Sequence, residues 1–144
     1  MALPDPVPGL VIGYAYLWRD EALRGLDEGL KDRPCCIVLS AQSVDGRTIV
    51  TVAPITHAPP RTPQTAVEIP RATKERLGLD GERSWIVAGD LNRFFWPGVD
   101  LRPIARGSRR YAYGLLPANL YRELRDKVLA LARGGHAAIT PRGE

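Results

Sequence analysis

The sequence predicts one α+β domain, in which a small, twisted antiparallel sheet or barrel is capped by a helix near the C-terminus. Two features predict this class: short β-rich runs separated by turn residues fill the first hundred positions, and one amphipathic run follows Pro117. At 144 residues, 44% hydrophobic and 25% charged, the chain is large enough for a hydrophobic core of its own. We expect a single domain over residues 1–144, with its core at about 9–132.

The first strand is expected at residues 9–18, after an extended lead-in at 1–8 that holds three prolines. Apolar side chains occupy both alternating faces of this run, which is typical of a strand covered on both sides. The segment 19–32 is polar and interrupted by glycines, so we predict a mobile loop with room for one helical turn.

A β-hairpin is the clearest local feature of the sequence. Residues 35–41 and 48–55 are β-rich runs that flank a turn containing Asp45-Gly46. An Asp-Gly pair between two such runs favours a hairpin, because both residues tolerate the turn conformation. We therefore expect these two strands to pair with each other.

The remaining elements follow from turn and cap residues. They are a strand at 66–69, a helix at 71–77 that Gly78 ends, a strand at 84–88, a short strand at 101–104, a turn at 106–110 and a helix from Pro117 to Gly134-Gly135. Residues 89–98 mix acidic, amide, cationic and aromatic side chains directly after a strand, and we predict a functional loop there. The segment 134–144 is expected to be a flexible tail.

The cysteines, histidines and apolar runs exclude several classes of protein. Cys35 and Cys36 are adjacent and should point to opposite faces of a strand, so no structural disulfide is expected. Together with only His57 and His136, far apart in sequence, they do not match the ligand spacing of a metal site, and we expect no metal and no cofactor. The longest apolar run is about half of a membrane span, which predicts a cytoplasmic protein with no membrane contact.

Positive charge is concentrated in the second half of the chain. The net charge is +4, and residues 73–144 hold thirteen Lys and Arg against eight Asp and Glu. Most of these cations are arginine, whose planar fork binds phosphate or carboxylate through two hydrogen bonds. The composition favours an anionic polymer or an acidic protein tail as partner, and it is equally compatible with a genome whose codons favour arginine.

Arg33 is the first candidate for function. Pro34 fixes the backbone at the start of the strand that follows, so Arg33 should lie on a loop rim above a buried strand, where a phosphate-binding arginine belongs. The second strand of the hairpin ends in Thr56-His57. If the two runs pair, Arg33 and Thr56 lie near each other.

Taken together, the order of these motifs resembles the MazF/PemK family of type II toxin endoribonucleases. The similarity covers about residues 9–132 and rests on Gly9-Leu10-Val11-Ile12-Gly13, Arg33-Pro34, Cys36-Ile37-Val38-Leu39-Ser40, Pro54-Ile55-Thr56, Val67-Glu68-Ile69, the run from Ser84 to Asp90, and Gly114-Leu115-Leu116. The resemblance implies an SH3-like antiparallel barrel of the CcdB/PemK type, a homodimer, an antitoxin protein with an acidic segment, and metal-independent cleavage of single-stranded RNA.

Carried over by position, the resemblance places the catalytic arginine at Arg33 and the catalytic hydroxyl at Thr56. The chain also departs from the family. Leu30-Lys31-Asp32 replace the Gln and Gly common before the Arg-Pro pair, and Asp90-Leu91 replace an Asp-Gln pair, with Asn92 as the possible amide substitute. These departures bear on loop contacts and on the choice of RNA sequence.

The reaction expected for such a nuclease begins with attack of a ribose 2′-OH on the adjacent phosphorus. Arg33 and Thr56 could stabilise the charged phosphoryl oxygens, each key donor contributing roughly 3–4 kcal/mol. Arginine is a poor base near neutral pH, so the group that moves the proton stays open. His57 has a suitable pKa but could face away as the neighbour of Thr56, and Asp90 could accept a proton, orient Arg33 or serve only as a turn residue.

Substrate binding is expected from cations and aromatic rings, because single-stranded bases stack on aromatic faces. Asn92, Arg93 and Trp96 are the candidates, while the neighbouring phenylalanines are assigned to the core or a dimer contact. A second hypothesis is a non-catalytic barrel toxin or binding module that captures a protein partner such as a topoisomerase subunit. A separate expectation is that the acidic segment of an antitoxin lies over Arg33 and competes with RNA.

Overall fold

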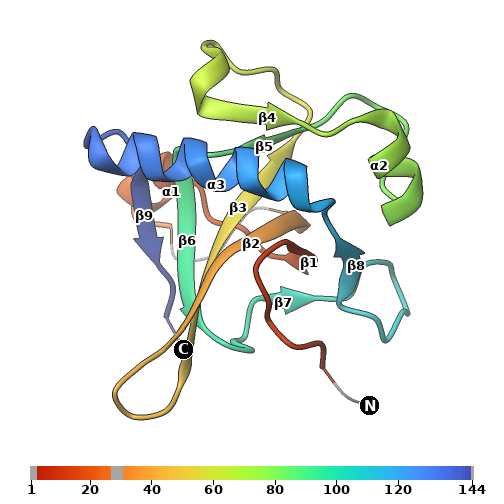
Figure 1. The fold of residues 1–144 in the computed structure, drawn as a ribbon. Coiled ribbons are helices and arrows are strands. Elements are labelled where there is room, and N and C mark those ends of the chain that lie inside the picture. Colours follow the sequence, from red (N-terminus) through yellow and green to blue (C-terminus); the bar gives the residue numbers. More distant parts are fainter. Residues whose placement is uncertain (1–2, 27–30, 144) are drawn as a thin grey trace.

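A mostly antiparallel sheet forms the framework, and the long helix α3 lies across one of its faces (Figure 1). The structure is a computed structural model and describes residues 3–26 and 31–143. Within this part of the chain the strands are β1 (Leu10–Tyr14), β2 (Arg33–Gln42), β3 (Thr48–Thr56), β4 (Ala66–Glu68), β5 (Trp85–Val87), β6 (Asp90–Phe95), β7 (Leu101–Arg102), β8 (Ala112–Leu115) and β9 (Ala138–Pro141). The helices are α1 (Arg19–Leu23), the short 3-10 helix η1 (Pro63–Thr65), α2 (Arg71–Leu77) and α3 (Ala118–Arg133).

Strand β3 is the centre of the sheet, because three other strands pair with it. One edge pairs with β2, in a register that sets Cys36 opposite Ala53. The other edge pairs first with β6 and then, at Ile55 and Thr56, with β5. The C-terminal end of β3 therefore lies between the start of β2 on one side and β5 on the other.

The α+β class, the hairpin and both predicted helices are confirmed. Gly46 in the hairpin turn has φ +81° and Gly78 after α2 has φ +74°, the left-handed region that glycine adopts without strain. The helix near the C-terminus begins directly after Pro117 and ends before Gly134. The strand expected at 9–18 is shorter, β1, but all five of its residues are buried, so the prediction that both faces are covered is correct.

Segments 90–95 and 138–141 differ from the expectation. Residues 90–95, predicted as a functional loop, form strand β6, and residues 138–141 of the expected flexible tail form β9, which pairs with β6 in parallel. Arg142 then donates its backbone N–H to the Arg93 carbonyl, which fixes the end of the tail. The predicted loop at 19–32 contains the one helical turn expected there, α1. Residues 27–30 of this segment lie outside the described residues, as do 1–2 of the lead-in and 144 of the tail.

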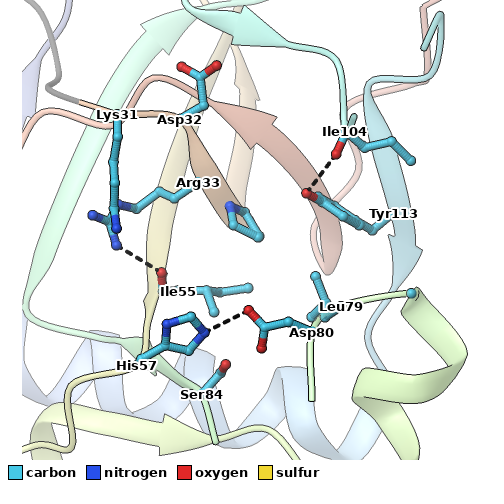
Figure 2. A pocket seen from close by; sticks show the side chains of 12 residues that line it. Lys31, Asp32, Arg33, Ile55, His57, Leu79, Asp80, Ser84, Ile104 and Tyr113 are labelled. Atoms are coloured by element: carbon cyan, nitrogen blue, oxygen red, sulfur yellow. Dashed lines mark hydrogen bonds and ion pairs between the residues drawn. The ribbon is translucent and has the colours of Figure 1, made fainter. Parts of the chain in front are cut away.

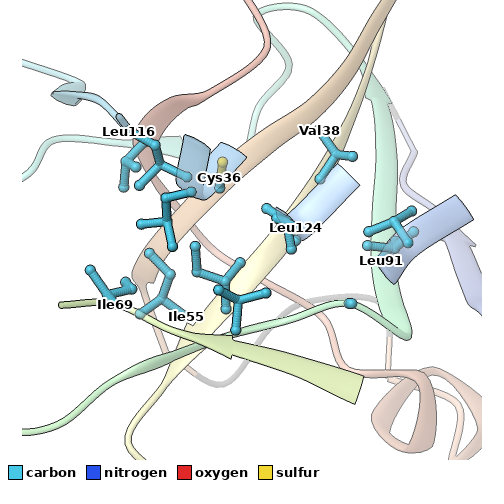
Figure 3. Packing of buried hydrophobic residues seen from close by; sticks show 14 of the residues in the cluster. Cys36, Val38, Ile55, Ile69, Leu91, Leu116 and Leu124 are labelled. Carbon is cyan, nitrogen blue, oxygen red and sulfur yellow. The ribbon is translucent and has the colours of Figure 1, made fainter. Parts of the chain in front are cut away.

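Two clusters of buried side chains cover the two faces of the sheet. Helix α3 contributes Leu120, Leu124 and Val128 to the first cluster, where they pack against the sheet (Figure 3). Burying a leucine side chain contributes about 1.5–3 kcal/mol, so this stripe is what holds the helix on the sheet. In the second cluster the rings of Tyr14 and Phe94 stack with centroids 4.6 Å apart.

The adjacent cysteines belong to different clusters, Cys36 to the first and Cys35 to the second. They therefore point to opposite faces of β2, as predicted. Both are free and fully buried, and this burial raises the pKa of each thiol well above its usual range. A thiol in that state is not a nucleophile near neutral pH. Among the described helices, none combines the length and the apolar character needed to cross a bilayer.

Candidate active site

The ends of β2 and β3 meet at a surface hollow of about 340 Å³ (Figure 2). Its walls come from these strand ends, from the turn after α2 and from β8. The described polar side chains that line it are Lys31, Asp32, Arg33, His57, Asp80, Ser84 and Tyr113. Two of them, Arg33 and His57, are candidates from the sequence.

Arg33 starts β2 and reaches across to β3, where its Nη1 donates a hydrogen bond to the Ile55 carbonyl at 3.2 Å. Its guanidinium also lies 5.1 Å from the centre of the Trp18 ring. Its Nε is buried without a hydrogen-bond partner, and no ion pair within the described part of the chain involves this residue. The guanidinium is held in place, and within the described part of the chain its Nη2 donates no hydrogen bond, so this nitrogen is the donor left for an anion.

Thr56 is the last residue of β3, and β2 begins with Arg33 at the same end of the strand pair, but Thr56 is not among the described residues that line the hollow. Side chains alternate along β3, so Ile55 and His57 line it and Thr56 does not. The Thr56 hydroxyl accepts a hydrogen bond from the Ala58 N–H at 3.2 Å. This bond spans His57 and so fixes the backbone that carries the imidazole.

His57 forms a pair with Asp80, whose carboxylate oxygen lies 2.8 Å from the imidazole Nε2. Both side chains are about half exposed, at 48% and 53%. The hydrogen bond from Lys74 lowers the pKa of Asp80 below its usual range, and the bond to His57 adds to this effect. An ionised carboxylate only accepts hydrogen bonds, so Nε2 is the donor and Nδ1, on the Arg33 side of the ring in Figure 2, is left as the basic nitrogen.

The buried side chain of Lys74 holds the Asp80 carboxylate of this pair in place. Its side chain is only 6% exposed, and its ammonium donates to Asp80 Oδ1 at 2.8 Å, to Ser84 Oγ at 2.6 Å and to the Glu82 carbonyl. A buried ammonium is costly unless it is paired and hydrogen-bonded, and here three acceptors satisfy it. Lys74 therefore fixes both the position and the charge of Asp80.

His57, Asp80 and Glu82 also place potential metal-ligand atoms within 4.8 Å of one another. The Lys74 ammonium is already bonded to Asp80 and to the Glu82 backbone. A metal cation would have to sit beside this positive charge, which opposes binding. The cluster is better described as a histidine–carboxylate pair than as a metal site.

Asp90 lies outside the hollow, at the start of β6. Its carboxylate accepts hydrogen bonds from the Tyr16 hydroxyl and from the Arg19 N–H at 3.2 Å. Burial raises the pKa of Asp90, against the effect of these two bonds. The side chain thereby anchors the segment that connects β1 with α1. Contacts through Tyr16 and Trp18 connect it with Arg33.

Asn92 is fully buried, which corrects the expectation that it contacts a substrate. Its amide accepts a hydrogen bond from the Leu17 N–H at 3.0 Å and donates to the Leu17 carbonyl at 2.8 Å, and Arg142 Nη1 also donates to it at 3.0 Å. All three bonds are internal. Asn92 therefore holds the chain after β1 against β6 and has no surface to offer a ligand.

Arg93 and Trp96 lie towards the other end of the sheet. Arg93 pairs with Thr51, and the Trp96 N–H donates to the Thr48 carbonyl. At about 3.3 Å per strand residue, these positions are roughly 16 and 26 Å along β3 from Thr56. Arg93 is exposed, and Trp96 is partly buried against the second cluster. The structure does not bring them together with Arg33.

Sequence reasoning missed Lys74 and Asp80. Asp80-Gly81 reads as an ordinary turn, and Lys74 as one solvated residue of a short helix. One signal was available, because position 74 lies one helical turn before the buried Leu77 and so shares its inward face. The contact of Asp80 with His57, 23 residues away, depends on tertiary structure.

No protein-family model, no curated protein and no solved structure matches this chain.

Proposed function

We propose that this protein is an endoribonuclease, which cleaves single-stranded RNA without a metal ion, and that it is the toxin of a type II toxin–antitoxin pair acting in the cytoplasm. One observation carries the proposal: an arginine with unused donors and a histidine–carboxylate pair line the same hollow. A phosphodiester needs these two functions, charge stabilisation and proton transfer. The order of motifs shared with MazF/PemK toxins supports the same reading.

In the proposed reaction the 2′-oxygen forms a bond to phosphorus and the bond from phosphorus to the 5′-oxygen breaks. His57 Nδ1 accepts the 2′-OH proton, and the 5′-oxygen leaves as a hydroxyl after taking a proton from the imidazolium or water. Arg33 donates to the phosphoryl oxygens, whose negative charge grows in the transition state. The products are a 2′,3′-cyclic phosphate and a 5′-OH.

Two residues act through His57 in this scheme. Asp80 orients the imidazole and stabilises its positive charge while the proton is held, and Lys74 keeps Asp80 ionised. Thr56 is assigned a positioning role, since its hydroxyl is bonded to the Ala58 N–H. Of the two groups that the sequence left open for proton transfer, this scheme chooses His57 over Asp90 and adds Asp80 as its partner.

The finer description of the fold belongs to the same proposal. We infer that the sheet curves into an SH3-like barrel, which is supported by the way β3 changes partner from β6 to β5 along one edge. A homodimer is also proposed, because two copies of the hollow would form a longer groove for a polymer. Sedimentation of the purified protein at micromolar concentration tests it, and a monomer there would contradict it.

The decisive experiment is incubation of the protein with single-stranded RNA of mixed sequence in EDTA, with product ends identified by mass spectrometry. Wild type should yield 2′,3′-cyclic phosphate and 5′-OH ends. His57→Gln should lose about 10²–10⁴ in rate. The matched control is His136→Gln, which removes the other histidine of the chain and should cleave like wild type. Absence of cyclic phosphate with wild type would contradict the proposal and favour a binding module.

The antitoxin is proposed to place an acidic segment over Arg33 and Lys31. Both cations line the hollow and would attract a peptide carboxylate as they would a phosphate. A cognate antitoxin should therefore compete with RNA. If RNA binds with equal affinity to the free protein and to the antitoxin complex, the acidic segment lies elsewhere.

A further inference from the structure

A second hollow, of about 350 Å³, adjoins the candidate active site on the other side of Arg33. The two hollows share five of their lining residues, among them Arg33 and Tyr113, so they are two parts of one continuous depression. The second part is lined in addition by the connection between β7 and β8, including Arg106 and Gly107. Nothing in the chemistry proposed above uses this part.

The connection between β7 and β8 is strongly cationic. It carries Arg106, Arg109 and Arg110, and no acidic residue occurs between Asp100 and Glu123. All three arginines are exposed, and within the described part of the chain none of them forms an ion pair. Their charges are therefore not neutralised by the protein itself.

Among the described residues, one acidic side chain lines the second hollow, and its charge is offset. Asp32 lies 3.5 Å from the Arg102 guanidinium. With this pair counted as neutral, Arg33 and Arg106 leave the second hollow positive. Tyr113, on the boundary between the two hollows, is held by a hydrogen bond from its hydroxyl to the Ile104 carbonyl at 3.3 Å.

The loop that carries Arg106 is internally bonded. Ile104 N–H donates to the Arg110 carbonyl at 2.8 Å, and Ser108 N–H donates to the Ala105 carbonyl at 3.0 Å. Gly107 has φ +76°, a conformation in which other residues are strained. The backbone is thus set in one closed turn, so that less ordering is needed when Arg106 meets an anion.

We propose that the second hollow is a subsite for a further phosphate of the same single-stranded polynucleotide, with Arg106 as its main contact. The inference rests on the proposed function and extends it: the substrate is a chain with at least two consecutive phosphates inside one depression, one at Arg33 and one at Arg106. Such a site prefers a polymer to a dinucleotide. It places the second phosphate on the β7–β8 loop and assigns no contact to Arg93 or Trp96, which do not line the hollow.

The test is binding of a fluorescent twelve-nucleotide 2′-O-methyl RNA, which lacks the attacking hydroxyl and is not cleaved. Arg106→Ala should weaken binding about three- to tenfold at 50 mM salt and lower the slope of log affinity against log salt by about 0.7, the value for one phosphate contact on a single strand. Arg106→Lys should keep most of that slope. Arg122→Ala, which removes an exposed arginine of α3 outside both hollows, is the matched control and should bind like wild type.

Equal affinity of Arg106→Ala and Arg122→Ala would overturn the inference. So would binding of polyglutamate that depends on Arg106 while RNA binding does not, because the site would then serve an acidic protein. Failure of the proposed function gives a different pattern: wild type binds the uncleavable RNA through Arg106 but produces no cyclic phosphate from ordinary RNA. If instead wild type cleaves RNA and the Arg106 variant binds normally, only the subsite is lost.

Discussion

Two polar clusters of similar composition behave in opposite ways in this molecule. We call them the buried cluster, formed by Asn92, Asp100 and Arg142, and the open cluster, formed by Arg33, His57 and Asp80. In the buried cluster Arg142 is 2% exposed and bonded to Asp100, to Asn92 and to the Ala15 carbonyl. In the open cluster the guanidinium keeps unused donors beside a hollow.

The difference is one of hydrogen-bond satisfaction. A cluster whose donors and acceptors are matched internally contributes to the fold, whereas one that leaves donors facing a hollow is free to act on a ligand. Polarity alone does not separate the two cases. The comparison predicts that substitutions in the buried cluster reduce stability and that substitutions in the open cluster reduce activity.

The largest effect is expected for Arg142→Ala. Removing one partner of a buried ion pair leaves Asp100, whose side chain is 12% exposed, without its closest cation. The free energy of unfolding should fall by about 3–5 kcal/mol. Urea denaturation measures this, with Arg133→Ala on the exposed end of α3 as control. A loss below about 1 kcal/mol would show that the buried cluster does not hold the sheet together.

Arg33→Ala should show the reverse pattern. The variant lacks the guanidinium that donates hydrogen bonds to the phosphoryl oxygens, so the rate of RNA cleavage should fall by about 10²–10³. The free energy of unfolding should change by only about 1 kcal/mol, because within the described part of the chain the Arg33 side chain makes one hydrogen bond, to the Ile55 carbonyl. The comparison breaks if the variant unfolds as easily as Arg142→Ala, since Arg33 would then be a structural residue.

Asn92→Ala should reduce stability by about 1–3 kcal/mol, because the Leu17 N–H and carbonyl lose their partner in the interior. Cleavage per folded molecule should stay at the wild-type rate. A rate lowered tenfold or more in a sample shown to be folded by circular dichroism would restore Asn92 as a substrate contact and contradict its burial.

The smallest expected effect concerns how folding stability depends on pH. Asp80 and Asp90 should contribute to this dependence with opposite signs. The pKa of Asp80 is lowered in the fold, so its contribution to stability is present above the unfolded pKa of about 3.8 and is lost as pH falls through the lower folded value. The pKa of Asp90 is raised, so its contribution is greatest below about 3.8 and is lost as pH rises through the higher folded value. Asp80 is half exposed, so its share should stay below about 1 kcal/mol.

The two contributions can be separated by measuring the free energy of unfolding of Asp80→Asn and Asp90→Asn between pH 2.5 and 7. Relative to wild type, the Asp80 variant should lose stability as pH rises through that window, and the Asp90 variant should gain it. The same direction of change in both variants would show that the two carboxylates share one kind of environment, contrary to the comparison.

Local signals predicted the elements that depend on neighbours in sequence. The turn at Asp45-Gly46, the glycine after α2 and the apolar stripe of α3 each act within a few residues, and each element formed where it was expected. Arg33 at the strand entrance and His57 at the strand exit were found in the same way, because Pro34 and the hairpin fix their positions.

The misassigned parts depend on distant partners. Strand β6 was interpreted as a functional loop because Asn92 and Arg93 are polar, yet Asn92 is satisfied by Leu17 and by Arg142, 75 and 50 residues away. Strand β9 pairs in parallel with β6 and has no local turn to announce it. Asp80 was missed for the same reason. Polar residues in such positions reveal their role only when the partner is known.

The bond between Arg142 and the Ala15 carbonyl joins residues 127 positions apart. On a ribosome that adds about 5–20 residues per second, roughly 6–25 s pass between the synthesis of its two ends. During this interval the chain after β1 lacks the cation that will cover it, while the hairpin that carries Arg33 is already complete. The nascent chain thus passes through a stage in which Arg33, His57 and Asp80 are present but β9 has not yet paired with β6.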